Sequence, residues 1–80
     1  MLVLKNVKKI DNRIEADFCF PDIDVHGSVV YDIQKNQIDE ISCKEQEDLE
    51  NIYGIVHLKR VLEMMVEHNR YPETYTYLWF

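Results

Sequence analysis

Glycine is scarce in this sequence of 80 residues, which has only Gly27 and Gly54. A loop that cradles phosphate groups needs several glycines in close succession, so that class of nucleotide site is excluded. The Cys-x-x-Cys, His-Glu-x-x-His and Gly-x-Ser-x-Gly patterns are also missing. The sequence therefore predicts no catalytic residue, no cofactor and no identifiable small-molecule ligand, and an enzyme is the less favoured interpretation.

Long apolar runs are missing too, since the longest cover residues 1–4 and 77–80. A transmembrane helix needs about 20 apolar residues and a signal peptide about 7–15. With 46% hydrophobic and 30% charged residues, we expect a soluble, cytoplasmic protein with a single domain over residues 1–80. Cys19 and Cys43 are expected to be thiols in the core or at its margin, because no signal peptide points to an oxidising compartment.

The net charge of −6 is unevenly distributed along the chain. Residues 1–13 are basic, whereas residues 14–50 hold eleven acids and two lysines. A net acidic chain is repelled by a phosphate backbone, so nucleic acid is an unfavoured partner, kept as an alternative only by Lys5, Lys8 and Lys9. We expect instead that the basic segment lies beside the acidic strand that follows it.

Alternation of apolar and polar residues predicts four strands joined by short turns, an antiparallel meander. The expected strands cover residues 2–10, 14–20, 25–33 and 37–41. Asp11-Asn12 suits the first turn, and Asn36 is the residue of segment 34–36 best suited to a positive φ. A further strand is expected at residues 74–80.

A long helix is expected from Ser42 to Asn69. Ser42 and Glu45 have the spacing of a capping box, and Asn69 can close the last turn. The apolar side of this helix changes near Gly54. The change fits a kink, a break, or a helix that contacts two surfaces, and the sequence does not choose among them.

The predicted fold is therefore an α+β domain, a mainly antiparallel sheet of four or five strands in ββββαβ order with the helix packed on one face. The side chains expected in the core are Ile14, Phe18, Phe20, Val29, Tyr31, Leu58, Leu62 and Met65.

Aromatic residues gather at the end of the chain, and Tyr75, Tyr77, Trp79 and Phe80 are the predicted partner or dimer interface. One helix covers only one face of a sheet, so a strand that is apolar on both faces needs a second cover. We expect a non-enzymatic interaction or regulatory module that forms a homodimer or binds another protein. The alternative cover is the chain's own loop 21–24 or the end of its helix.

Two other functions remain open from sequence. An acidic inhibitor or immunity-type protein would neutralise a basic partner through Glu45, Glu47 and Asp48. A metal-assisted enzyme would use Asp22, Asp24 and His26, which share one face of an extended segment. Asp-x-Asp beside a proline is also ordinary turn chemistry, so we expect no metal ligand there.

Overall fold

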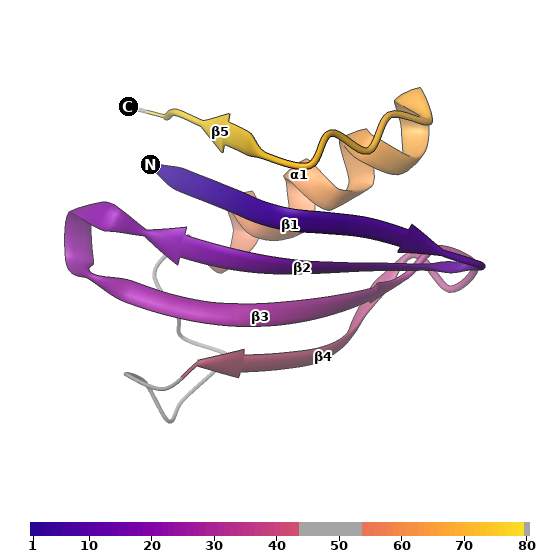
Figure 1. The fold of residues 1–80 in the computed structure, drawn as a ribbon, viewed down its shortest axis with the longest axis horizontal. Coiled ribbons are helices and arrows are strands. Elements are labelled where there is room, and N and C mark those ends of the chain that lie inside the picture. The colour runs from indigo at the N-terminus through magenta and orange to yellow at the C-terminus, as the bar shows by residue number, and fades with distance from the viewer. Residues whose placement is uncertain (44–53, 80) are drawn as a thin grey trace.

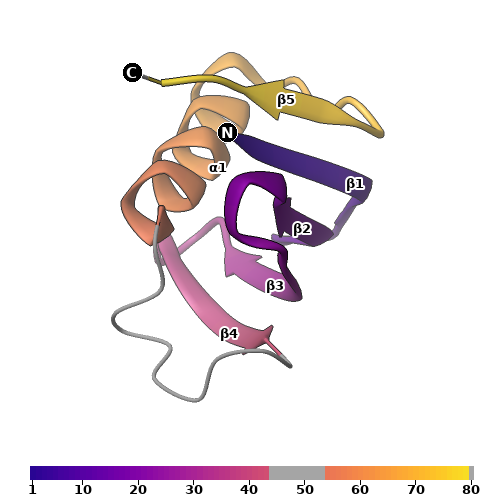
Figure 2. The ribbon, with the colours of Figure 1, turned by 90° about the vertical axis from the view of Figure 1, so that its left-hand side faces the viewer.

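A five-stranded antiparallel sheet carries the fold in this computed structural model, which describes residues 1–43 and 54–79 (Figure 1). The elements are β1 (Leu2–Ile10), β2 (Arg13–Phe20), the short 3-10 helix η1 (Pro21–Ile23), β3 (Val25–Asp32), β4 (Gln37–Cys43), α1 (Ile55–His68) and β5 (Tyr75–Tyr77). The strand order is β4-β3-β2-β1-β5. Figure 2 shows α1 on one side of this sheet. The α+β prediction is confirmed.

Residue alternation sorts the side chains of the strands into two faces. In β2 every second residue from Ile14 to Phe20 is buried. The register places them opposite buried residues that include Leu4 of β1 and Val25, Val29 and Tyr31 of β3. All eight predicted core residues are buried, so that prediction is confirmed. The turns also follow the prediction, because Asp11 and Asn36 adopt φ values of 53° and 55°.

The helix α1 has 14 residues and two well-defined ends. Gly54, with a φ of 80°, precedes its first residue, and Asn69, with a φ of 52°, ends it as predicted. The Asn69 N–H donates to the Val66 carbonyl at 3.2 Å. The residues that α1 buries against the sheet are Leu58, Val61, Leu62 and Met65.

The predicted start of the helix at Ser42 is wrong, since Ser42 and Cys43 belong to β4. They pair with Ser28 and Gly27 of β3, and a backbone ladder to an existing strand outweighs a local capping signal. The rest of that capping box lies in residues 44–53, outside the described residues, as do Glu45, Glu47 and Asp48. A long or kinked helix is therefore not confirmed.

The last strand lies at an edge of the sheet, beside β1. It is shorter than predicted, and Leu2 and Leu4 are the register partners of Tyr77 and Tyr75. Both leucines are fully buried on the face that α1 covers. The two tyrosines consequently lie on the same face as the core.

The contact between Phe18 and Gly27 explains why position 27 needs a residue without a side chain. The Phe18 ring lies directly over Gly27 in the neighbouring strand. A Cβ atom at Gly27 would be 2.6 Å from Phe18 Cζ and 2.2 Å from the Ser42 carbonyl oxygen. A side chain here would force β3 and β4 apart or displace the ring.

Gly27→Ala is expected to lower the free energy of unfolding by about 2–3 kcal/mol, because overpacking strains the core. Ser28→Ala is the matched control, since Ser28 is exposed on the other face of the same strand, and its effect should stay within about 0.5 kcal/mol. Urea unfolding monitored by circular dichroism measures both. Equal stabilities of the two variants would contradict the close approach at Gly27.

Tyr31 joins the core to the turn after β3. Its side chain is fully buried, and its hydroxyl donates a hydrogen bond to Asn36 Oδ1. Burial, with a smaller contribution from the Glu63 carboxylate of α1, raises the pKa of Tyr31 above its ordinary value of 10.0. The fold therefore favours the neutral phenol.

Stability should consequently fall as the pH rises above about 10, because the unfolded chain ionises its tyrosine before the folded chain does. The contribution of Tyr31 is fully present below that pH and is lost as the pH passes the raised pKa. Thermal unfolding at a series of alkaline pH values measures the slope. Tyr31→Phe should be less stable at neutral pH, for lack of the bond to Asn36, and should show a shallower alkaline loss. An identical alkaline slope in both proteins would be the contrary result.

Candidate functional site

The aromatic side chains near the end of the chain form a cluster with His57 in the first turn of α1. The ring of Trp79 stacks on the imidazole of His57, with ring centroids 4.0 Å apart and planes inclined by 14°. The edge of Phe20 meets Trp79 at 6.4 Å, and Tyr77 lies 5.9 Å from Trp79. Nδ1 of His57 is buried and has no hydrogen-bond partner among the described residues. The cluster thus ties the end of β5 to α1 and β2.

This cluster bears on the predicted interface of Tyr75, Tyr77, Trp79 and Phe80. The first three are half-buried and pack against the core of their own chain, whereas Phe80 lies outside the described residues. On one side, α1 and Phe20 cover these rings. Leu78 turns the other way and is 59% exposed. The rings keep partly exposed surfaces, so a contact with a partner at this strand stays a proposal.

The outer edge of β5 is the second feature of this region. Within residues 1–43 and 54–79, β5 pairs with β1 alone. A shallow hollow of about 690 Å³ adjoins the strand, between it and the C-terminal half of α1. Its lining includes Met64, Tyr71, Pro72 and Tyr75. An edge strand beside an apolar hollow is a surface to which another strand can add.

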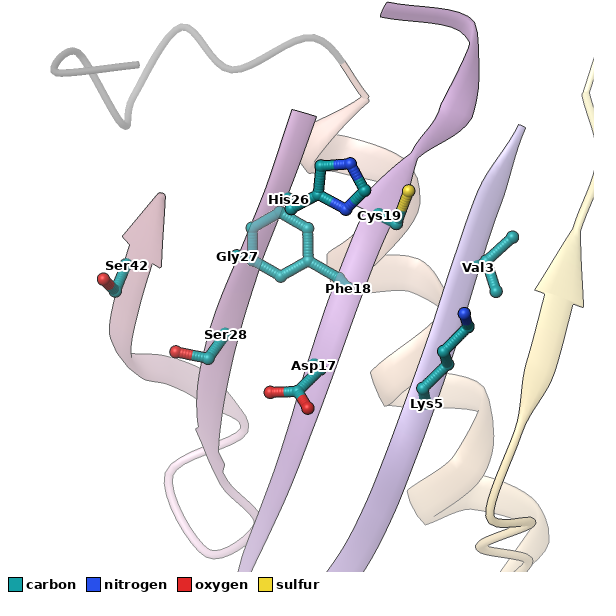
Figure 3. Close-up of a pocket in the computed structure, with 9 residues that line it drawn as sticks. All are labelled: Val3, Lys5, Asp17, Phe18, Cys19, His26, Gly27, Ser28 and Ser42. Atoms are coloured by element: carbon teal, nitrogen blue, oxygen red, sulfur yellow. The ribbon is translucent and has the colours of Figure 1, made fainter. Parts of the chain in front are cut away.

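The face of the sheet opposite α1 carries a separate hollow of about 500 Å³ (Figure 3). Most of its lining consists of polar side chains that alternate with the core residues of β1, β2 and β3. Across the strands, Lys5 lies opposite Asp17, and Cys19 lies opposite His26. Lys8 likewise lies opposite Glu15, so the expected pairing of the basic segment with the acidic strand is confirmed.

The structure brings together two of the three proposed metal ligands, Asp22, Asp24 and His26. His26 Nε2 lies 3.0 Å from Asp24 Oδ1, whereas Asp22 Oδ2 lies 2.8 Å from the Met1 amino nitrogen. Among the described residues, no group of three or more histidine, cysteine or acidic side chains is arranged to hold a metal ion. Asp24 itself adopts a φ of 53° at the end of η1, which is turn geometry.

Sequence reasoning did not place Cys19 beside His26. From the sequence, Cys19 is expected in the core or at its margin, and His26 is grouped with Asp22 and Asp24. The alternation of Cys19 with the buried Phe18 and Phe20 already places it on the less apolar face of the strand. Its cross-strand partner follows only from the register between β2 and β3.

Comparisons with protein-family models, with curated proteins and with solved structures found no match for this chain. The helix that the structure describes is too short and too polar to cross a membrane. The β5 edge and the open face of the sheet are therefore the surfaces from which a function can be inferred.

Trp79→Ala should lower the free energy of unfolding by about 2–3 kcal/mol, because it removes a half-buried ring from the contacts with His57 and Phe20. Leu78→Ala is the matched control, since Leu78 is adjacent but exposed, and its effect should stay within about 0.5 kcal/mol. Chemical unfolding of both variants at low protein concentration separates folding from association. Similar small effects would show that the Trp79 ring contributes little to the folded monomer.

Proposed function

We propose that this protein is a small, non-enzymatic interaction module of the cytoplasm, which forms a homodimer along the outer edge of β5. The observation that carries the proposal is the position of β5 at the edge of the sheet with a row of large aromatic side chains on one face. An edge strand presents backbone donors and acceptors that a second strand can satisfy. The row of tyrosines supplies contact area at low conformational cost.

A two-fold axis beside β5 is the simplest arrangement for such pairing. Two copies of an antiparallel edge strand can pair with each other, so both protomers use the same surface. The half-buried faces of Tyr75, Tyr77 and Trp79 would extend the core across the two sheets. Leu78 and the hollow lined by Met64 and Tyr71 adjoin the same edge, and the pairing would remove their apolar surface from water.

Neither alternative function has comparable support. The acids that would contact a basic partner, Glu45, Glu47 and Asp48, lie outside the described residues. The metal-assisted enzyme needs Asp22, Asp24 and His26 in one site, and only the last two are in contact.

Sedimentation velocity over a range of micromolar concentrations tests the proposal. The unmodified protein is expected to sediment as a dimer in reversible exchange with a monomer. Leu78→Lys places a charge beside the β5 edge on each protomer and should weaken association by about tenfold or more, which corresponds to a loss of about 1.4 kcal/mol.

Ile10→Lys is the matched control for this experiment. Ile10 is also an exposed apolar residue, 39% accessible, but it lies at the turn end of β1, whereas β5 pairs with the opposite end. This variant should associate as the unmodified protein does. An unmodified protein that stays monomeric at all concentrations would refute the dimer, and equal weakening by both substitutions would refute its location at the β5 edge.

A further inference from the structure

The open face of the sheet places Cys19 beside His26 at one end of the hollow in Figure 3, and Asp24 of the adjoining turn contacts His26. We propose that Cys19 is a reactive thiol, activated by His26 and Asp24, and that it undergoes exchange with small disulfides. The site is separate from the β5 edge and uses none of its residues.

The register between β2 and β3 brings the thiol and the imidazole together. Cys19 and His26 are direct partners in that register, and both side chains lie on the open face, since their neighbours Phe18, Phe20 and Val25 are buried. The Cβ atoms of such opposed residues are about 4.5–5.5 Å apart. Figure 3 shows the sulfur of Cys19 beside the imidazole ring of His26.

The turn between β2 and β3 supplies the carboxylate that contacts His26. Asp24 ends η1 in the left-handed conformation and reaches His26 two residues later, with 3.0 Å between Oδ1 and Nε2. A carboxylate can only accept a hydrogen bond, so Nε2 is the donor nitrogen of the neutral ring. Nδ1 is then the nitrogen that can accept a proton, and the bond to Asp24 holds the orientation of the ring.

The charges around the hollow decide how far the thiolate is favoured. Lys5 extends along β1 toward Val3, which is the register partner of Cys19, and its ammonium favours a negative sulfur (Figure 3). Asp17 lies on the same face, two residues before Cys19, and opposes the thiolate. Asn6 Nδ2 donates to the Asp17 carboxylate at 2.8 Å, which disperses part of that negative charge. Among the described residues, His26 is the direct cross-strand partner of Cys19, and we expect its effect to dominate.

The proposed exchange reaction requires a disulfide as its only co-reactant. His26 takes the proton of the Cys19 thiol, and the thiolate attacks one sulfur of the disulfide. The bond between Cys19 Sγ and that sulfur forms as the disulfide bond of the reagent breaks. The departing thiolate takes its proton from the imidazolium, so His26 returns to its neutral form. The hollow of about 500 Å³ gives a small reagent room beside the sulfur.

Cys43 provides an internal comparison. It also carries a thiol, but it packs against the core in β4. Cys43→Ser leaves Cys19 as the single thiol, and Cys19→Ser leaves Cys43. The reaction rate of each protein with the disulfide of thionitrobenzoate, followed from about pH 5.5 to about pH 9, gives the pH midpoint of each thiol.

The expected midpoint for Cys19 is at least about one pH unit below the 8.5 of an ordinary cysteine. Adding His26→Gln should return it toward that value, whereas His68→Gln, an exposed histidine at the end of α1, should leave it unchanged. Asp24→Asn should cause a smaller rise than His26→Gln, because Asp24 acts on the sulfur through the imidazole. A Cys19 midpoint of 8.5 or higher, or one that does not respond to His26→Gln, would overturn the proposal.

A measurement on the unmodified protein tests the proposal without depending on whether the variants fold. Limited reaction at about pH 6.5, followed by peptide mass spectrometry, shows which cysteine has reacted first. Preferential modification of Cys19 supports the proposal, and equal or preferential modification of Cys43 contradicts it.

Discussion

Among the described residues, the helix α1 covers one face of the five-stranded sheet, and the rest of the structure follows from this constraint. Because side chains alternate along each strand, covering one face divides every strand into a buried set and an accessible set. The buried set, from Leu2 and Leu4 through Phe18 to Tyr31, packs on α1. The accessible set carries the charges and the pair of Cys19 and His26. Folding and chemistry therefore occupy opposite faces of the same sheet.

One proposed site adjoins the covered face of the sheet, and the other lies on the open face. The β5 edge continues the covered face, and its aromatic rings stabilise the monomer while they leave partial surface for a second copy. The Cys19 site depends on the uncovered face and on register alone. A protein of this size buries a small core, so association along an edge would also add stability.

Much of the fold follows from residue patterns within single strands. The alternation of Ile14, Ala16, Phe18 and Phe20 predicted a half-buried strand, and the tolerance of Asp11, Asn36 and Asn69 for positive φ predicted the turns and the helix end. The predicted start of the helix at Ser42 was wrong. The capping signal is local, whereas the pairing of Ser42 with Ser28 depends on a strand that is distant in the sequence. The stack of Trp79 on His57 and the opposition of Cys19 and His26 also join distant segments, and no local pattern encodes them.

The division of the sheet into a covered and an open face is the central claim, and nuclear Overhauser contacts between side chains test it most directly. The account predicts contacts of the Trp79 ring with both Phe20 and His57, and contacts of Cys19 with His26 but none with α1. Contacts of Cys19 or Ser28 with Leu58 or Leu62, or a Trp79 ring without contacts to Phe20, would contradict it.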